Sequence, residues 1–235
     1  MIPLRDDQPS LSTPFINYFL IALNIIIFLL ELAVGAQSRG DLNALMYQFG
    51  VVPTHEVALL SGIPRFSPGA ALLPILTSMF LHASWGHVIG NMWFLWIFGD
   101  NIEDYLGHFK YLVFYLLSGI AASFTHILLN ANSPYPSVGA SGAIAGVLGA
   151  YFLLYPRARV LTWFPIFFLF ELPAWLILGY WFVIQFLSGT ATAIAETGQS
   201  QGGVAFWAHV GGFVAGILMI KLFPARPRRY RYGTW

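Results

Sequence analysis

Long apolar stretches alternate along the chain with short charged or turn-forming segments. A helix needs about 20 apolar residues to cross the ~30 Å hydrocarbon core of a bilayer, and six stretches are candidates for such spans. The predicted spans are Phe15–Val34, Ser84–Gly99, Phe109–Leu129, Gly139–Tyr155, Ile166–Leu187 and Val204–Phe223. The fourth is short and rich in small residues. The pattern therefore predicts an all-α membrane protein, a bundle of six transmembrane helices.

Composition supports this interpretation and excludes other classes of protein. Charged residues make up 9% of the chain, against roughly 25% in an ordinary soluble domain, and mean hydropathy is +0.69. So few charges cannot cover a soluble globule, and 17% aromatic residues are the opposite of a disordered composition. The chain has no cysteine, so it can form no disulfide, Cys-ligated metal site or thiol nucleophile.

The distribution of basic residues predicts the orientation of the bundle. Six spans place both termini on one side, and that side carries nine of the eleven Lys and Arg residues, leaving Arg39 and Arg65 on the other. Because basic segments stay in the cytoplasm, we expect both termini there, in a plasma (inner) membrane. The chain then divides into a cytoplasmic segment 1–14, a membrane domain 15–223 and a basic cytoplasmic tail 224–235.

Segments outside the spans have simpler interpretations. The tail Arg226–Arg231 is typical of a basic flank that stops translocation, rather than of a specific lipid or nucleic-acid site. The first span is interpreted as a retained anchor, because its flank is not positive and its apolar run is longer than that of a signal peptide. On the outer side, Gly35–Thr77 forms a long first loop. The polar stretch Ser188–Gly203 is expected to form a mobile cover.

Polar residues from three predicted spans reach a similar depth in the membrane. Spans two, four and six start from the outer face, and near those starts lie His87 and Asn91, Ser141, and His209 respectively. At 1.5 Å per residue, each lies roughly 3–10 Å below the start of its helix. His87 and Asn91 are four residues apart and share one helix face. Because polar side chains inside a membrane are costly, this shared level predicts a functional site.

Small residues predict how two of these helices meet. They recur at a spacing of four: Gly142, Gly146 and Ala150 in span four, and Gly212 and Gly216 in span six. Such faces let helix backbones approach closely in lipid. Packing there would bring the Ser141 hydroxyl to the His209 imidazole, the pair needed for nucleophilic catalysis.

The remaining requirement is stabilisation of a developing oxyanion. Ser141 lies at a predicted helix N-terminus, where backbone N–H groups are free and the helix dipole favours negative charge. The Asn91 amide and the His87 ring can each donate a further hydrogen bond. No acidic residue is in register with the imidazole, since Glu31, Asp100 and Glu171 fall near other helix ends or faces. We therefore predict a Ser–His dyad rather than a triad.

Three motifs carry a resemblance to a known family. Residues 77–91 read TSMFLHASWGHVIGN and contain the pattern His-x4-His-x3-Asn, residues 139–142 read GASG, and residues 208–212 read AHVGG. In this order and on these spans, the chain resembles the rhomboid intramembrane serine proteases from about Thr77 to Gly216. The resemblance implies Ser141 as nucleophile, His209 as general base, and an oxyanion site formed by Asn91, His87 and the Ser141 backbone.

The same motifs include residues with other expected roles. The resemblance adds His82, Gly139 and Gly142 as motif residues, and His82 is expected to be structural because it is out of helical phase with Asn91. Ala145 occupies a position where the family often has an aromatic ring beneath the histidine, so another side chain must orient the imidazole. Neither a metal nor an organic cofactor is implied.

The sequence thus predicts an intramembrane serine endopeptidase. Its partners would be membrane lipid and transmembrane protein substrates, cut in or beside their helices, and not nucleic acid. A zinc protease fits poorly, because no Glu lies between His82 and His87, and an aspartyl protease fits poorly with Asp100 alone. Two alternatives remain: an inactive rhomboid-like protein that binds membrane clients, and a small-solute transporter, which the lack of internal repeats disfavours.

Overall fold

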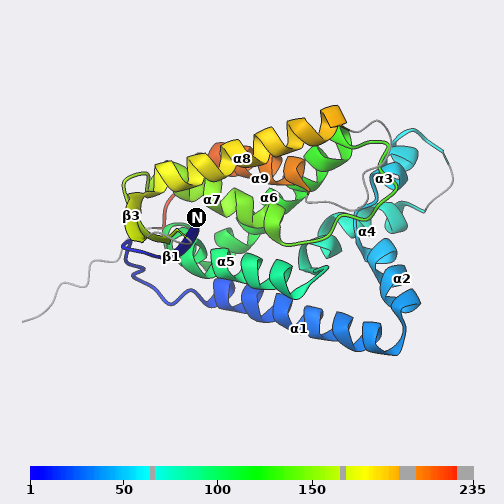
Figure 1. Cartoon of the computed structure of the whole chain (residues 1–235), viewed down its shortest axis with the longest axis horizontal. Coiled ribbons are helices and arrows are strands. Elements are labelled where there is room, and N and C mark those ends of the chain that lie inside the picture. Colours follow the sequence, from blue (N-terminus) through cyan, green and yellow to red (C-terminus); the bar gives the residue numbers. More distant parts are fainter. Residues whose placement is uncertain (64–66, 165–167, 196–204, 227–235) are drawn as a thin grey trace, which may run out of the picture.

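The computed structural model describes residues 1–63, 67–164, 168–195 and 205–226. Within these ranges the chain forms nine α-helices, a short 3-10 helix η1 and three strands. In chain order they are β1 (Ile2–Asp6), α1 (Phe15–Gln37), α2 (Arg39–Phe49), α3 (Pro53–Leu60), α4 (Pro68–Thr77), η1 (Ser78–Phe80), α5 (Trp85–Leu106), α6 (His108–Leu129), α7 (Ser141–Leu154), β2 (Arg159–Trp163), β3 (Leu169–Pro173), α8 (Ala174–Ala195) and α9 (Phe206–Met219). Figure 1 shows α1 along one edge of the bundle, α8 along the opposite edge, and α7 between them.

Three of the described helices are long and apolar enough to cross a membrane: α1, α6 and the Ala174–Ala193 part of α8. Residues Leu72–Phe80 and α5 would make a fourth, broken span, bent by 84° at the break. The helices α7 and α9 have 14 residues each, roughly 21 Å of helix, which is short of a ~30 Å core. The chain is an integral membrane protein of three or four candidate spans, and six crossings stay a prediction.

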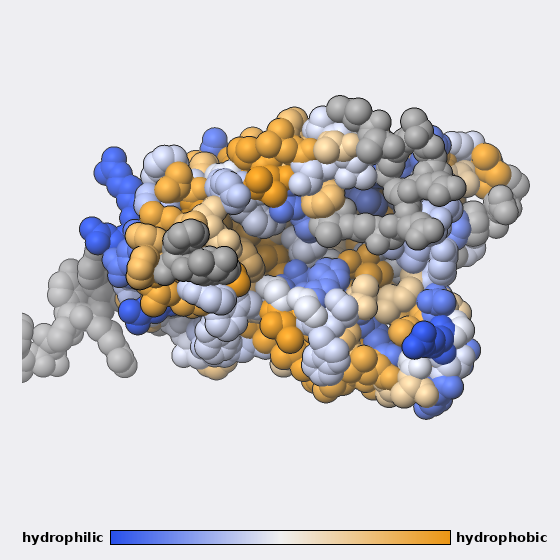
Figure 2. Space-filling view, viewed as in Figure 1, coloured by the Kyte–Doolittle hydropathy of each residue, from blue (hydrophilic) through white to orange (hydrophobic). Residues whose placement is uncertain are grey.

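The outer surface of the bundle is suited to lipid. Large apolar side chains project outward from α1, with Phe19, Ile26 and Leu30 each more than half exposed, and from α8, with Trp175 and Leu187 likewise. Figure 2 shows this hydrophobic surface over α1 and α8 at opposite edges, while polar residues gather toward the two ends of the long axis. Burying so much apolar area against hydrocarbon is what holds such a chain in a bilayer.

The prediction of an all-α fold needs a correction, because β1, β2 and β3 form a three-stranded antiparallel sheet. Part of the N-terminal segment 1–14 is therefore a strand, with Ile2 opposite Trp163, and β2 pairs with β3 from Arg159–Pro173 to Trp163–Leu169. The chain as a whole is mostly helical. The sequence pattern did not reveal the sheet, because each strand has only five residues. In addition, β2 and β3 lie 153 positions or more after the end of β1, and no motif links them to it.

The helix of the fifth predicted span starts later than expected because strand β3 lies near the beginning of that span. The predicted span starts at Ile166, which lies outside the described residues, and within it Leu169–Pro173 form β3, so the helix begins only at Ala174. Proline lacks the N–H that a helix interior requires, so it favours a helix start at this point. The helix then runs to Ala195, beyond the predicted end at Leu187. The second span is also longer than predicted, and the first outer loop contains α2, α3 and α4.

Local capping fixes where the central helices begin and end. The Ser84 side chain accepts the His87 N–H at 3.2 Å and caps α5, which ends at Gly107 with a positive φ of 81°. The Glu103 carboxylate accepts the N–H groups of Ile16 and Asn17 at 3.0 and 2.7 Å. It thereby satisfies the free donors of α1, whose own sequence offers no capping side chain.

Both described ends of the chain lie at one end of the bundle. The sheet joins β1 to the segment that follows α7, and the backbone N–H of Arg226 donates to the Tyr105 carbonyl at 2.7 Å near the end of α5. The Lys110 ammonium at the start of α6 donates to the Pro224 carbonyl at 3.1 Å. The N-terminus of α7 points away from this end, so Ser141 lies toward the opposite side of the membrane domain.

Candidate active site

Ser141 and His209 meet inside the bundle. Ser141 is the first residue of α7, and His209 lies in the first turn of α9. Their side chains form a hydrogen bond of 2.7 Å between Oγ and Nε2. The histidine is buried, with 8% of its surface exposed, and the serine is half-buried. A hydroxyl at this distance from an imidazole nitrogen can transfer its proton directly.

Glycines explain why these two helices come so close. A Cβ atom on Gly212 would lie 2.1 Å from the Gly142 carbonyl oxygen, and one on Gly216 would lie 2.0 Å from the Gly146 carbonyl oxygen. Both distances are far inside van der Waals contact, so the backbones of α7 and α9 touch with no side chain between them. The small-residue faces of the sequence therefore lie against each other in the structure, and they hold Ser141 against His209.

The turn before Ser141 also requires glycine. Gly139 has a φ of 132°, which L side chains rarely adopt, and its N–H donates to the Ser78 carbonyl at 2.8 Å. A Cβ there would lie 2.7 Å from Cε1 and Nε2 of His87 and 3.6 Å from Ser141 Oγ. The His87 ring therefore lies over this turn, close to the hydroxyl. The structure brings His87, Gly139 and Ser141 together.

Asn91 and His82 form a second hydrogen-bonded pair in the site. The Asn91 amide nitrogen lies 2.9 Å from His82 Nε2, and the His82 and His87 rings pack edge-on with centroids 5.1 Å apart. An amide nitrogen only donates, so His82 accepts, and Asn91 carries a second N–H. His82 lies in the bend before α5 and not on the helix, so helical phase does not apply and its ring reaches Asn91. Its structural role stays a prediction.

Glu31 connects the first helix to this pair. Both of its carboxylate oxygens lie 3.2 Å from the backbone N–H of His82, and the neighbouring Phe28 packs edge-on against the His82 ring. Glu31 is 3% exposed although it sits in a helix whose other face is strongly apolar and exposed. It fixes the bend that carries His82 and so supports Asn91, a role that the sequence did not reveal.

Two further contacts to the His209 imidazole come from α8 and were missed in the sequence. Gln185 Oε1 lies 2.7 Å from His209 Nδ1. Trp181, one helical turn earlier, packs against the same ring with centroids 5.7 Å apart and planes tilted by 36°. These two residues orient the His209 imidazole, which the small, fully buried Ala145 cannot do. The available signal was Gln185 itself, an amide within the apolar run of the fifth span.

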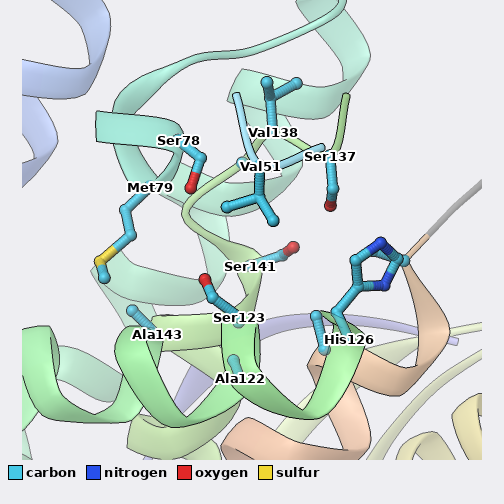
Figure 3. Close-up of a pocket in the computed structure, with 15 residues that line it drawn as sticks. Val51, Ser78, Met79, Ala122, Ser123, His126, Ser137, Val138, Ser141 and Ala143 are labelled. Carbon is cyan, nitrogen blue, oxygen red and sulfur yellow. The ribbon is translucent and has the colours of Figure 1, made fainter. Parts of the chain in front are cut away.

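A small pocket opens beside the nucleophile candidate. Ser78, Ser123, Ser137 and His126 line it together with Ser141, and Figure 3 shows their side chains around one space at the start of α7. The polar lining suits water or a peptide group. Among the described residues, no three His, Cys, Asp or Glu side chains are placed to hold a metal ion.

Some predicted features fall outside the described residues. The cover Ser188–Gly203 is described only up to Ala195, as the end of α8. Arg65 and most of the tail Arg226–Arg231 also lie outside the described ranges.

Comparisons with known proteins agree on one family. A family model described as a rhomboid domain matches residues 70–226. The chain is 33% identical over 150 residues to rhomboid protein 1, mitochondrial, of Saccharomyces cerevisiae, covering 62% of this chain and 40% of that protein. It is 30% identical over 188 residues to the presenilin-associated rhomboid-like protein, mitochondrial, of Mus musculus, covering 76% and 45%. It is 36% identical over 143 residues to rhomboid protease GluP of Bacillus subtilis, covering 60% and 24%. The matches span less than half the length of each of these relatives.

Proposed function

The chain belongs to the rhomboid family, and we propose that it is a serine endopeptidase that cuts membrane proteins in or beside their transmembrane segments. The observation that carries this proposal is the 2.7 Å hydrogen bond between Ser141 Oγ and His209 Nε2. Because the matches span less than half of the listed relatives' lengths, the catalytic activity is a proposal built on the site itself.

The geometry supports a two-step acyl transfer. In the first step, Ser141 Oγ bonds to the carbonyl carbon of the scissile peptide while its proton moves to His209 Nε2. The tetrahedral intermediate then collapses, the C–N bond breaks, and the imidazolium returns that proton to the leaving amine. In the second step, a water molecule loses a proton to His209 and attacks the acyl ester. Collapse of that second intermediate returns the proton to Ser141 Oγ and releases the carboxylic acid.

The oxyanion of each intermediate would lie at the N-terminus of α7. First-turn N–H groups there have no partner within the helix, and the helix dipole favours negative charge. The second N–H of Asn91 and the ring of His87 add donors from α5. Preorganised donors of this kind lower the barrier most where water is excluded.

The membrane arrangement is also proposed. We place six helices across the bilayer. The short α7 lies inside the bundle, where ten of its 14 residues are buried, and the short α9 packs against it through Gly212 and Gly216. Residues 15–223 would form the membrane domain, and 1–14 and 224–235 would lie in the cytoplasm. The excess of Lys and Arg on that side supports this orientation, as does the position of both described ends at one end of the bundle. Ser141 would then lie toward the outer face.

The substrate class follows from the chemistry of a helix. A transmembrane helix hides each carbonyl in a hydrogen bond to the N–H four residues later, so it must unwind locally before Ser141 can attack. We expect preferred substrates to carry Gly or Pro near the cut and a small residue at the cleavage position. Replacing such helix breakers by Ala or Leu should slow cleavage.

The test uses purified full-length protein with a model transmembrane substrate. Wild type is compared with Ser141→Ala and His209→Ala, and with Ser133→Ala, a control in the loop between α6 and α7. We expect wild type and the control to cleave the substrate and to react with a fluorophosphonate, and both site variants to lose both reactions. Cleavage by all variants, or by none, would refute the proposal. In the second case, retained substrate binding would favour an inactive client-binding protein.

A further inference from the structure

The imidazole of His209 is held from the side opposite Ser141 by α8. Gln185 Oε1 lies 2.7 Å from Nδ1, while Nε2 faces the Ser141 hydroxyl at 2.7 Å. Trp181 packs against the ring from the same helix. Trp181 and Gln185 are four residues apart, so they project from one face of α8 and hold the imidazole by its face and by its edge.

The atoms in these contacts favour one tautomer of His209. An amide oxygen has lone pairs and no hydrogen, so it can only accept. Nδ1 must therefore carry the proton and donate it to Gln185. In the neutral ring Nε2 then has no proton, and its lone pair faces the Ser141 O–H. This is the tautomer that a general base needs, because the other one would present an N–H to the hydroxyl and could not accept its proton.

We propose that Gln185 is a positioning residue of the catalytic site, which keeps His209 in the Nδ1–H tautomer so that Nε2 can accept the Ser141 proton. This inference rests on the proposed function. Gln185 gives and takes no proton in it. When Nε2 gains the Ser141 proton, the imidazolium still donates through Nδ1 to the Gln185 oxygen, and that bond becomes stronger because its donor is charged. Gln185 thus stabilises the charged form of His209 more than the neutral form.

The surroundings of Gln185 support this role over a merely structural one. The residue lies in an apolar helix, where a polar side chain is costly unless it is hydrogen-bonded. The packing of α8 on α9 has its own source, since Phe182 stacks on Phe213 with centroids 4.8 Å apart and Trp181 adds a second ring contact to Phe213 at 6.1 Å. These ring contacts attach the helix without Gln185, whose side chain bonds the histidine.

The test compares Gln185→Leu and Gln185→Glu with wild type and with Thr190→Val. Thr190 is the matched control, a polar residue of α8 whose hydroxyl bonds the carbonyl of Phe186 in its own helix. Gln185→Leu keeps the size and removes the acceptor. We expect its kcat and its rate of fluorophosphonate labelling to fall about 10- to 100-fold, with little change in KM, as for loss of a hydrogen bond to a group that becomes charged. Thr190→Val should stay within twofold of wild type.

Two further measurements distinguish a loss of His209 positioning from a loss of protein stability: the activity of Gln185→Glu and the tautomer of His209. A carboxylate restores the acceptor and favours the imidazolium, so we expect Gln185→Glu to recover activity relative to Gln185→Leu and to move the acid limb of its pH–rate profile to higher pH. The ¹⁵N NMR spectrum of histidine-labelled protein, with His209→Ala to assign the signal, should report Nδ1–H in wild type and a shift toward Nε2–H in Gln185→Leu.

Each outcome decides the inference. If the NMR spectrum of wild type shows the proton of His209 on Nε2, the inference is overturned, even where Gln185→Leu does not fold. An active wild type beside an equally active Gln185→Leu overturns it too and leaves the proposed function intact. A wild type that neither cleaves nor labels overturns the proposed function, and the inference falls with it.

Discussion

Substituting Gly212 by alanine tests whether backbone contact between α7 and α9 is what aligns Ser141 with His209. The new Cβ would lie 2.1 Å from the Gly142 carbonyl oxygen, which is backbone and cannot rotate away. To reach ordinary contact near 3.4 Å, the helices must separate by about 1.3 Å. His209 lies one turn before Gly212, so its 2.7 Å hydrogen bond to Ser141 would lengthen to roughly 4 Å, beyond hydrogen-bond range.

The expected result is an inactive protein that remains folded. A displacement of about 1 Å can cost on the order of 100-fold in rate, and overpacking of this kind costs about 1–3 kcal/mol of stability. We therefore expect fluorophosphonate labelling of Ser141 to fall at least about 100-fold, while the helical circular dichroism spectrum is retained.

A second glycine provides the control. A Cβ on Gly179 of α8 would meet Phe152 at 3.7 Å, an ordinary contact, so Gly179→Ala should label as wild type does. Labelling of Gly212→Ala within threefold of wild type would refute the argument, because Ser141 and His209 would then be aligned by something other than the contact between α7 and α9.

Two further predictions concern single polar side chains. Asn91→Ala should lower kcat about 100-fold with the protein still folded, as for loss of one oxyanion donor; an unchanged kcat in steady-state cleavage assays would remove Asn91 from the oxyanion site. Glu56 of α3 is 3% exposed, and burial raises the pKa of its carboxyl group from 4.5 to about 7. The folded state therefore holds a proton that the unfolded state releases, and stability should decline from about pH 4.5 up to pH 7 and level off above it. Glu56→Gln should remove this decline and stabilise the protein at pH 8 by about 1–3 kcal/mol, measured by thermal unfolding in detergent across pH 5 to 8; identical pH profiles for the two proteins would contradict the assignment.

The membrane class and the family were predictable because their signals are local. Apolar runs need no knowledge of tertiary contacts, and the motifs around His87, Ser141 and His209 are each contained in a short stretch of sequence. The rhomboid resemblance is confirmed by the family model over residues 70–226, and the integral membrane class by the long apolar helices. The roles of the individual site residues stay predictions, although Ser141 and His209 do lie in hydrogen-bond contact.

What could not be predicted depends on contacts between distant segments. The β1–β2 pairing joins residues near the N-terminus to residues that follow α7, and nothing in a five-residue stretch such as Ile2–Asp6 specifies its partner. The same holds for Glu31, which binds the backbone of His82 from 51 positions away, because a backbone N–H carries no sequence signal at all. Gln185 left a signal, an amide in an apolar helix, but its partner depends on the angle at which α8 crosses α9.

If His209 depends on α8 as proposed, a substrate that moves this helix would also disturb the imidazole. Among the described residues this helix is the least buried of the three long apolar ones, with 17% of its most apolar part buried inside the bundle, against 22% for α1 and 33% for α6. Gln185 Oε1 and His209 Nδ1 are 2.7 Å apart, so a shift of α8 by about 1 Å is enough to break their bond. If a substrate helix displaces α8 on its way in, chemistry must wait until α8 returns and the Nδ1–H tautomer is restored. Binding and cleavage would then be separate steps, and the lone pair on Nε2 would be available to Ser141 only in the closed arrangement.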